Sequence, residues 1–254
     1  MGKLLITTII MIFTSTLMHA QTIVPNLNDL SQNFIYAARA DGETKAYVDT
    51  LAVMNESALF EQLNNDAQKK AFFINIYNGY VQLLLKKDPE KYKKRSAFFS
   101  NKQILLAGHN ISLDDLEHGI LRHSRIKWSL GYFGKIFPAR FERKLRVDKI
   151  DYRIHFTLNC GAKSCPAIAY YKPEQINEQL DLATKTYLEG EANYVKENNT
   201  LYLPALMSWF RVDFGGKKKE VGLCKKLGLL PADVHPKVIY NKYNWSLYLK
   251  NYKS

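Results

Sequence analysis

Apolar and polar residues follow a helical spacing through much of the first half of the chain. Three stretches show this pattern: residues 26–40, 55–65 and 67–87. The third stretch ends at Asp88-Pro89, where the proline disfavours continuation of a helix. The pattern therefore predicts a helical N-terminal half.

In the third of these helices, apolar residues nearly surround the axis between residues 71 and 85. A helix of this kind is buried, and a buried amide must find a partner or cost about 1–3 kcal/mol. The polar positions between the apolar ones are Asn75, Asn78 and Gln82, which fall on one narrow strip. We expect this strip to contact the turn at residues 159–161, either as support for a site or facing a substrate.

Shorter elements follow in the middle of the chain. Residues 102–113 read as a hairpin around Gly108. Ser112 followed by Asp115 resembles a capping box, which predicts a helix over residues 113–122.

Strand patterns are confined to short segments of the second half. Residues 152–160 alternate as a strand, residues 172–190 read as a helix closed by Gly190, and residues 198–204 read as a hairpin arm. Because helices precede and flank a few strands, the order favours an α+β fold with the helical half packed on a small antiparallel sheet.

The helix predicted at residues 113–122 carries three polar residues that could perform chemistry. Glu117 lies at the edge of its buried face. His118 and Arg122 are spaced i and i+4 and share a different side, so the pattern places His118 outside the core, in solvent or facing a cleft.

The predicted strand at residues 152–160 sends His155 and Asn159 to one face and Cys160 to the other. A direct pair of His155 and Cys160 is not expected from a regular strand.

The turn "NCGAKSCP" contains two of the three cysteines, Cys160 and Cys165. Cys160 ends the predicted strand before Gly161, where a thiol can be presented to a cleft and nearby backbone amides can face a developing anion. The same spacing allows a disulfide if the turn brings the two side chains together. A zinc clip needs a further ligand, which would come from His118, His123 or His155. We favour a nucleophile at Cys160, and the spacing by itself leaves the three alternatives open.

The third cysteine, Cys224, sits among apolar residues and is interpreted as a buried small hydrophobe. About 234 residues remain when a leader of 20 is taken from 254, enough for a core that needs no disulfide. We find no internal repeat and no long linker, so residues 21–254 are expected to form a single domain.

The first 20 residues have the layout of a secretory signal peptide: one lysine, an apolar run from Leu4 to Phe13, small polar residues and Ala20. The run is too short to span a bilayer. The sequence thus predicts an exported protein, periplasmic or secreted, with no transmembrane segment after cleavage.

Removing Lys3 with the leader leaves 35 basic against 24 acidic side chains, a net charge of +11. This charge allows weak association with anionic envelope surfaces. The lysines come in solvated clusters without interleaved aromatic residues, which argues against nucleic acid as a partner. No cofactor is expected.

Five motifs in order, "FFINIYNGYVQLLL", "LEHGILR", "RIHFTLNCGAKSCPAI", "WFRVDFGG" and "YNWSLY", resemble the family called domain of unknown function 547. The resemblance covers about residues 66–250. The family looks related to papain-like and transglutaminase-like thiol enzymes, which implies that broad architecture, a Cys nucleophile, a His base and an acid or amide that orients the His.

The resemblance maps Cys160 onto the nucleophile and His118, in the Glu-His pair, onto the base. Glu117 or a helix amide such as Asn78 would orient the ring. A papain-like chain has its Cys before its His, so the order here requires a permuted arrangement.

We therefore expect an exported thiol-dependent hydrolase or acyl transferase that acts on an amide or thioester of a peptide or small thiol compound. Catalytic residues would be Cys160, His118 and Glu117, and substrate-binding or supporting residues would be Asn75, Asn78, Arg122, Asn159, Gly161 and Cys165. The alternatives are a non-catalytic module that binds a ligand in the same pocket, and a structural protein stapled by a Cys160–Cys165 disulfide.

Overall fold

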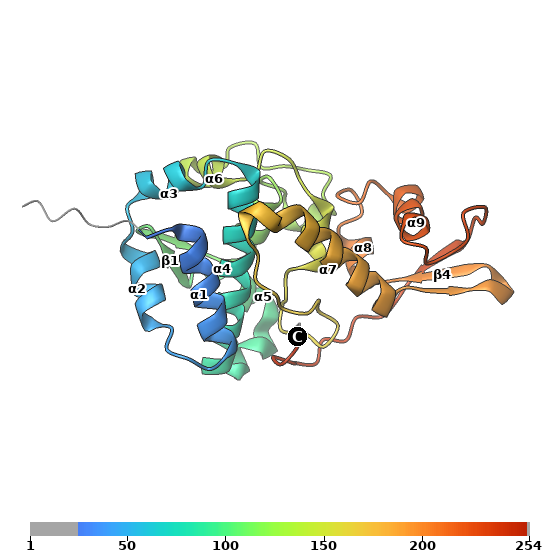
Figure 1. Cartoon of the computed structure of the whole chain (residues 1–254), viewed down its shortest axis with the longest axis horizontal. Coiled ribbons are helices and arrows are strands. Elements are labelled where there is room, and N and C mark those ends of the chain that lie inside the picture. The colour runs from blue at the N-terminus through green and yellow to red at the C-terminus, as the bar shows by residue number, and fades with distance from the viewer. Residues whose placement is uncertain (1–24, 253–254) are drawn as a thin grey trace, which may run out of the picture.

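The computed structural model describes residues 25–252, so the predicted signal peptide at residues 1–20 lies outside the described residues. The chain folds as an α+β protein in which helices gather at one end and the β3–β4–β5 sheet with α9 forms the other (Figure 1). Within the described residues, no helix has both the length and the apolar character needed to cross a bilayer.

Between residues 25 and 88 the chain is helical as predicted, with one helix more than the three expected there. Asparagine side chains at positions 26, 55 and 65 accept backbone N–H groups and start three of the four helices. The helices are α1 (Leu27–Arg39), α2 (Lys45–Val53), α3 (Glu56–Gln62) and α4 (Asp66–Lys87).

Helix α4 is the centre of the larger hydrophobic cluster and is buried along most of its length, as its apolar pattern predicted. Helix α1 crosses it closely at Gly79, where an added Cβ would lie 2.5 Å from the Phe34 ring. A larger residue at this position would therefore push the two helices apart.

The polar strip of α4 is buried as predicted, but its three amides hold three different segments. Asn78 contacts the cysteine turn: its Nδ2 donates to the Thr157 carbonyl at 2.9 Å and its Oδ1 accepts the Asn159 N–H at 2.8 Å. Asn75 instead pairs with the backbone of Tyr171, and Gln82 accepts from the Tyr252 hydroxyl. The expectation that all three meet the turn was right only for Asn78.

After α4, the chain forms η1 (Pro89–Lys94), α5 (Arg95–Ser100) and the predicted hairpin, whose strands are β1 (Ile104–Leu106) and β2 (His109–Ile111). The predicted capping box is present: Ser112 donates to Asp115, and the Asp115 N–H donates back to the Ser112 hydroxyl. The helix that it starts, η2 (Asp115–Leu121), is a π-helix.

The predicted strand at residues 152–160 was wrong, because this segment contains the 3₁₀ helix η4 (Tyr152–Phe156). Asp151 caps it by accepting the Arg153 N–H, and the Thr157 hydroxyl bonds back to the Ile154 carbonyl. Residues 154–159 are all buried, so the alternation in the sequence does not separate a core face from a solvent face.

A second, smaller hydrophobic cluster surrounds a small sheet late in the chain. Strand β4 pairs antiparallel with β3 and parallel with β5, so the sheet is mixed rather than antiparallel as expected. The elements are η3 (Lys127–Ser129), α6 (Arg140–Leu145), η5 (Pro173–Gln175), α7 (Ile176–Glu191), β3 (Asn193–Val195), η6 (Lys196–Asn198), β4 (Thr200–Leu203), α8 (Ala205–Trp209), α9 (Lys217–Lys226) and β5 (Lys237–Tyr240).

Residues 243–252 return from this sheet to the cysteine turn. The Lys163 N–H donates to the Ser246 carbonyl at 2.9 Å, and the Tyr248 N–H donates to the Gly161 carbonyl at 2.8 Å. The Asn251 side chain donates to the Cys165 carbonyl at 2.7 Å. The turn is thus held between α4 and this late segment.

Replacing Asn78 with alanine should strand two buried backbone groups, the Thr157 carbonyl and the Asn159 N–H. We expect Asn78→Ala to lower the free energy of unfolding by roughly 2–5 kcal/mol, since each unpaired buried group costs about 1–3 kcal/mol. Urea denaturation measures this loss. The exposed Asn110→Ala is the matched control, expected within about 0.5 kcal/mol of wild type. Equal stability of the two variants would contradict the role of Asn78.

Candidate functional site

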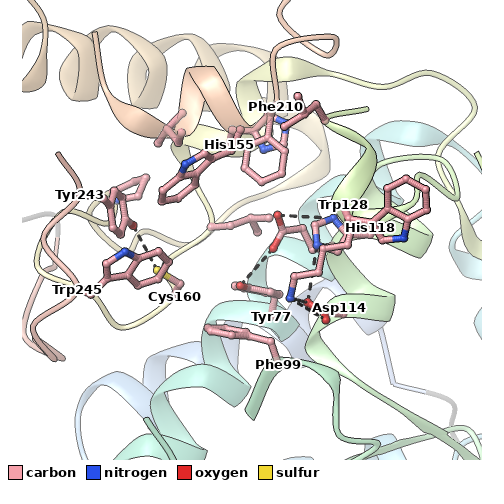
Figure 2. A pocket seen from close by; sticks show the side chains of 17 residues that line it. Tyr77, Phe99, Asp114, His118, Trp128, His155, Cys160, Phe210, Tyr243 and Trp245 are labelled. Atoms are coloured by element: carbon pink, nitrogen blue, oxygen red, sulfur yellow. Dashed lines mark hydrogen bonds and ion pairs between the residues drawn. The ribbon is translucent and has the colours of Figure 1, made fainter. Parts of the chain in front are cut away.

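A cavity of about 380 Å³ lies where α4, η2, the cysteine turn, α8 and residues 243–245 meet. Most of its wall is aromatic or aliphatic, and a few polar groups converge on it, which is the usual composition of a small-molecule site. In Figure 2, Cys160, Tyr243 and Trp245 lie on one side, and Asp114, His118 and Trp128 lie on the other. The lining residues with chemistry to offer are Tyr77, Asp114, Glu117, His118, Lys127, His155, Cys160 and Tyr243.

The π-helix brings Glu117 and His118 to the same cavity although they are neighbours in sequence. Its wider turn is seen in the Arg122 N–H, which donates to the Glu117 carbonyl five residues earlier at 2.9 Å. An α-helix would send adjacent side chains in clearly different directions. The helical pattern therefore could not show that these two side chains share one site.

The His118 side chain is almost fully buried, with 6% of the residue exposed. Burial lowers the pKa of this imidazole well below its usual value, and the nearby Arg122 guanidinium lowers it further. Arg122 Nη1 lies 2.8 Å from Nδ1. Because a guanidinium only donates, Nδ1 must be the acceptor, and the ring hydrogen is assigned to Nε2. His118 faces the cavity, which is one of the two positions that the sequence allowed.

Glu117 is the group in the cavity that titrates near neutral pH. Burial raises the pKa of its carboxyl to about 7, although Arg122 opposes the shift. Its Oε2 accepts from the Tyr77 hydroxyl at 3.4 Å. Its Oε1 is 3.9 Å from His118 Nδ1, too far for a hydrogen bond, so Arg122 rather than Glu117 orients the His118 ring.

A buried chain of charged groups lies behind His118. Arg122 Nε donates to Asp213 Oδ2 at 2.6 Å, and His155 Nε2 contacts the same oxygen at 2.8 Å. Phe210 contacts both side chains: its ring is stacked on His155 at a centroid distance of 3.8 Å and lies 4.5 Å from the Arg122 guanidinium. Burial would raise the pKa of Asp213, but the bonds from His155 and Arg122 overcome it and hold this pKa at about 2.

Sequence reasoning missed Asp213, Tyr243 and the role of His155. The wrong strand placed His155 opposite Cys160, whereas both side chains line the cavity. Asp213 belongs to the quoted motif "WFRVDFGG", and a single acid between aromatic residues was the available signal.

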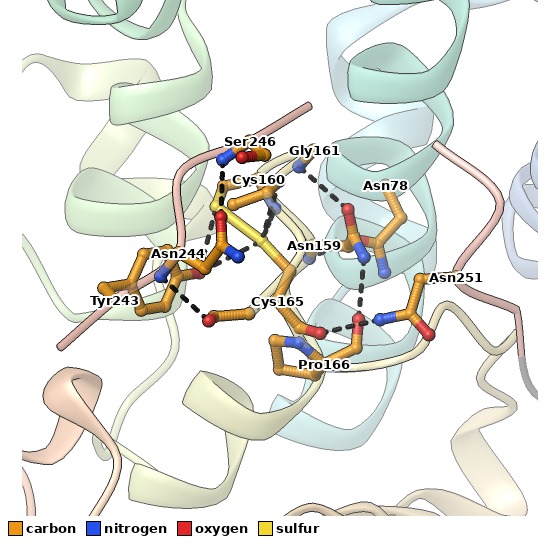
Figure 3. The surroundings of a disulfide bond; sticks show 12 residues. Asn78, Asn159, Cys160, Gly161, Cys165, Pro166, Tyr243, Asn244, Ser246 and Asn251 are labelled. Atoms are coloured by element: carbon orange, nitrogen blue, oxygen red, sulfur yellow. Dashed lines mark hydrogen bonds between the residues drawn. A yellow bond between two sulfur atoms is a disulfide. The ribbon is translucent and has the colours of Figure 1, made fainter. Parts of the chain in front are cut away.

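The cysteine turn is closed by a Cys160–Cys165 disulfide whose Cα atoms are 6.2 Å apart (Figure 3). Asn159 shapes the turn from inside: its Oδ1 accepts the Gly161 N–H and its Nδ2 donates to the Pro166 carbonyl. Gly161 has φ +84°, a backbone conformation that strains other residues, and an added Cβ would lie 2.7 Å from Leu85. Both the backbone conformation and the close contact therefore disfavour a side chain at this position. Much of the turn's shape therefore comes from contacts other than the disulfide.

The two sulfur atoms differ in their surroundings. Cys160 is partly exposed and lines the cavity, while Cys165 is buried. Cys165 Sγ accepts the N–H groups of Cys160 at 2.9 Å and Ala162 at 3.3 Å. The Tyr243 hydroxyl lies within 3.3 Å of both sulfur atoms. N–H donors of this kind stabilise a negative charge on sulfur, and here they are directed at Cys165.

The remaining predicted site residues support the cavity without lining it. They hold backbone segments or other side chains in place and are Asn75, Asn78, Arg122, Asn159, Gly161 and Cys165. Over residues 25–252, no group of three His, Cys, Asp or Glu side chains is arranged to hold a metal ion.

These features define an α+β protein with a cysteine turn set against an aromatic cavity. Residues 60–188 match the family described as "Protein of unknown function, DUF547". The match covers half of the chain, and the protein belongs to this family. No curated protein and no solved structure matches the chain. Glu117, His118 and Cys160 lie within the matched residues, whereas Asp213 and Tyr243 lie beyond them.

The raised pKa of Glu117 makes stability depend on pH. A carboxyl with a pKa of 4.5 in the unfolded chain and about 7 in the fold stabilises the protein fully at low pH, and this contribution is lost as the pH rises through about 7. Relative to wild type, the free energy of unfolding of Glu117→Gln should rise by about 3 kcal/mol from pH 4 to pH 8, since each pKa unit corresponds to about 1.4 kcal/mol. Urea denaturation across this range measures the gain.

Glu178→Gln is the matched control for this measurement, because Glu178 is exposed. Between pH 4 and pH 8 the free energy of unfolding relative to wild type should change more for Glu117→Gln than for Glu178→Gln. Equal changes in the two variants would show that the Glu117 carboxyl has an ordinary pKa in the fold.

Proposed function

We propose that the cavity is the active site of an exported, thiol-dependent hydrolase or acyl transferase that acts on amide or thioester bonds. The observation that carries this proposal is the convergence of Cys160, Glu117 and His118 on one largely apolar cavity. A sulfur nucleophile, a carboxyl that titrates near neutrality and a neutral imidazole are the groups that acyl transfer needs. A distant relationship to papain-like or transglutaminase-like enzymes is part of the same proposal.

The nucleophile is released by reduction. A small thiol, RSH, attacks Cys160 Sγ from the cavity, the S–S bond breaks, and Cys165 leaves as a thiolate facing the N–H groups of Cys160 and Ala162. A second RSH attacks the outer sulfur of the mixed disulfide, which breaks its bond to Cys160 and forms RSSR, and the protons of the two RSH molecules pass to the two cysteine sulfur atoms. The two cysteines end as thiols, so the electrons balance, and Cys160 is free to react.

In the acyl-transfer step, Cys160 Sγ attacks the carbonyl carbon and its proton passes to Glu117. His118 Nε2–H donates to the developing oxyanion, since Arg122 occupies Nδ1. Collapse of the tetrahedral intermediate breaks the C–N or C–S bond, and the leaving group takes the proton from Glu117. Water or an acceptor amine then cleaves the acyl-enzyme by the same route in reverse.

This assignment changes the roles expected from the sequence for His118 and Glu117. His118 was expected to carry the proton, but Arg122 donates to the nitrogen that a base would need, and the low pKa of His118 disfavours the imidazolium. Glu117 has a pKa of about 7, near the value that suits a proton acceptor at neutral pH. His155 and Asp213 act as positioning residues because they hold Arg122.

A second candidate is favoured by the disulfide itself. With its sulfur bonded to Cys165, Cys160 cannot attack a substrate, and the same aromatic cavity would then bind an apolar ligand without turnover. In the structural alternative, in which the disulfide only staples the turn, Cys160 is blocked in the same way. Reduction separates the catalytic proposal from both.

Iodoacetamide labelling tests the state and reactivity of the cysteines. Without reductant we expect no labelling of Cys160 or Cys165. After treatment with a phosphine, Cys160 should be labelled fastest because it lines the cavity, and Cys224 should stay unlabelled because burial raises its pKa to about 12. Peptide mass spectrometry identifies the site. Faster labelling of Cys165 than Cys160 would contradict the assignment.

Turnover is tested with the octanoyl thioester of 4-nitrothiophenol, which releases a coloured thiol. The phosphine-reduced protein should turn over, with kcat/KM rising through about pH 7 as Glu117 ionises. Cys160→Ser should lower kcat/KM at least a hundredfold. Glu117→Gln should lower kcat/KM about a hundredfold or more and abolish its rise with pH. Cys224→Ser is the control and should match wild type. Binding of octanoate with no turnover in reduced protein would favour the binding module.

A further inference from the structure

Residues 127–137 form a loop that exposes six large apolar side chains within eleven positions. Their exposed fractions are high for such residues: Trp128 76%, Leu130 42%, Tyr132 62%, Phe133 60%, Ile136 84% and Phe137 93%. Single exposed apolar residues are ordinary, but six on one short loop indicate an interaction surface.

The exposure is built into the backbone of the loop. The Ile126 N–H donates to the Phe133 carbonyl at 2.9 Å, and the Lys135 N–H donates to the Ser124 carbonyl at 2.7 Å, which closes the loop like a short hairpin. Inside it, the buried Ser129 hydroxyl donates to the Ile126 carbonyl and accepts the Phe133 N–H. These hydrogen bonds hold the loop together while its large apolar side chains stay exposed to solvent.

The loop lies in the most basic part of the chain. Residues 125–149 contain eight Lys or Arg and two Asp or Glu, a net +6 against +12 for all 254 residues. Lys127 and Arg140 pair with the acids Asp114 and Glu56 from outside this range. Counting these two acids still leaves +4, and Arg143 and Lys144 on α6 are exposed.

We propose that the 127–137 loop docks this protein on an anionic phospholipid bilayer. Trp, Tyr and Phe side chains favour the boundary between headgroups and acyl chains, and each nearby Lys or Arg adds attraction to an anionic surface. Ile136 and Phe137, the most exposed pair, enter the acyl region, while the basic residues of α6 meet the headgroups. The excess of positive charge beside these aromatic side chains favours an anionic lipid surface as the occupant.

Docking in this orientation places the cavity at the lipid surface, since Lys127, Trp128 and Leu130 belong to both the loop and the cavity wall. The cavity then receives apolar compounds that partition into membranes. The docking itself does not rest on the proposed catalysis, because no residue of the loop takes part in the acyl-transfer step.

Co-sedimentation with vesicles tests the docking. Protein lacking residues 1–20 should bind vesicles of phosphatidylglycerol and phosphatidylcholine at least tenfold more tightly than pure phosphatidylcholine, and raised salt should weaken the binding. The double variant Ile136→Ser/Phe137→Ser should lose at least tenfold in the partition coefficient. Val53→Ser/Leu182→Ser removes two exposed apolar residues from other elements and should bind within twofold of wild type. Circular dichroism confirms that both variants are folded.

Two results would overturn the proposal. One is equal binding by the loop variant and wild type. The other is a wild-type protein that does not bind vesicles but forms a dimer without lipid, as measured by sedimentation velocity. If the loop variant abolishes that dimer, the loop is a self-association surface. Cys160→Ser should bind vesicles like wild type, so failed catalysis and failed docking give separate readouts.

Discussion

The buried ion pair between Arg122 and Asp213 joins the two halves of this molecule. Both side chains are fully inaccessible, and they come from the π-helix of the N-terminal half and from the segment after α8. Removal of one partner of such a pair costs about 3–5 kcal/mol because the other charge is left buried and uncompensated. The pair also fixes His118 and His155, so the geometry of the cavity depends on the docking of the two hydrophobic clusters.

Local signals in the sequence were sufficient for the elements that are stabilised locally. The Ser112–Asp115 capping box, the hairpin at Gly108 and the buried helix α4 each follow from contacts within a few residues or from one apolar pattern. The 3₁₀ helix at Tyr152–Phe156 did not follow, because residues 154–159 are all buried and show no polar face that would distinguish a helix from a strand.

The candidate site was only partly accessible to sequence reasoning for a similar reason. Cys160, His118 and Glu117 were found because they lie in short, unusual motifs. Asp213 and Tyr243 reach the same place from 53 and 83 residues beyond Cys160, and the spacing of residues carries no trace of such contacts. The π-helix was equally hidden, because the bond from the Arg122 N–H to the Glu117 carbonyl five residues earlier leaves no mark in the apolar pattern.

The return of residues 243–252 to the cysteine turn bears on how the protein is made. Tyr243 and Trp245, which close the cavity, and Asn251, which bonds to the Cys165 carbonyl, are synthesised after every other part of the site. During synthesis the two cysteines and the helix that supports them exist before the segment that covers them. Until that segment arrives, the sulfur atoms are open to the thiols and oxidants of the compartment in which folding finishes, and pairing with the wrong thiol is most probable in this interval.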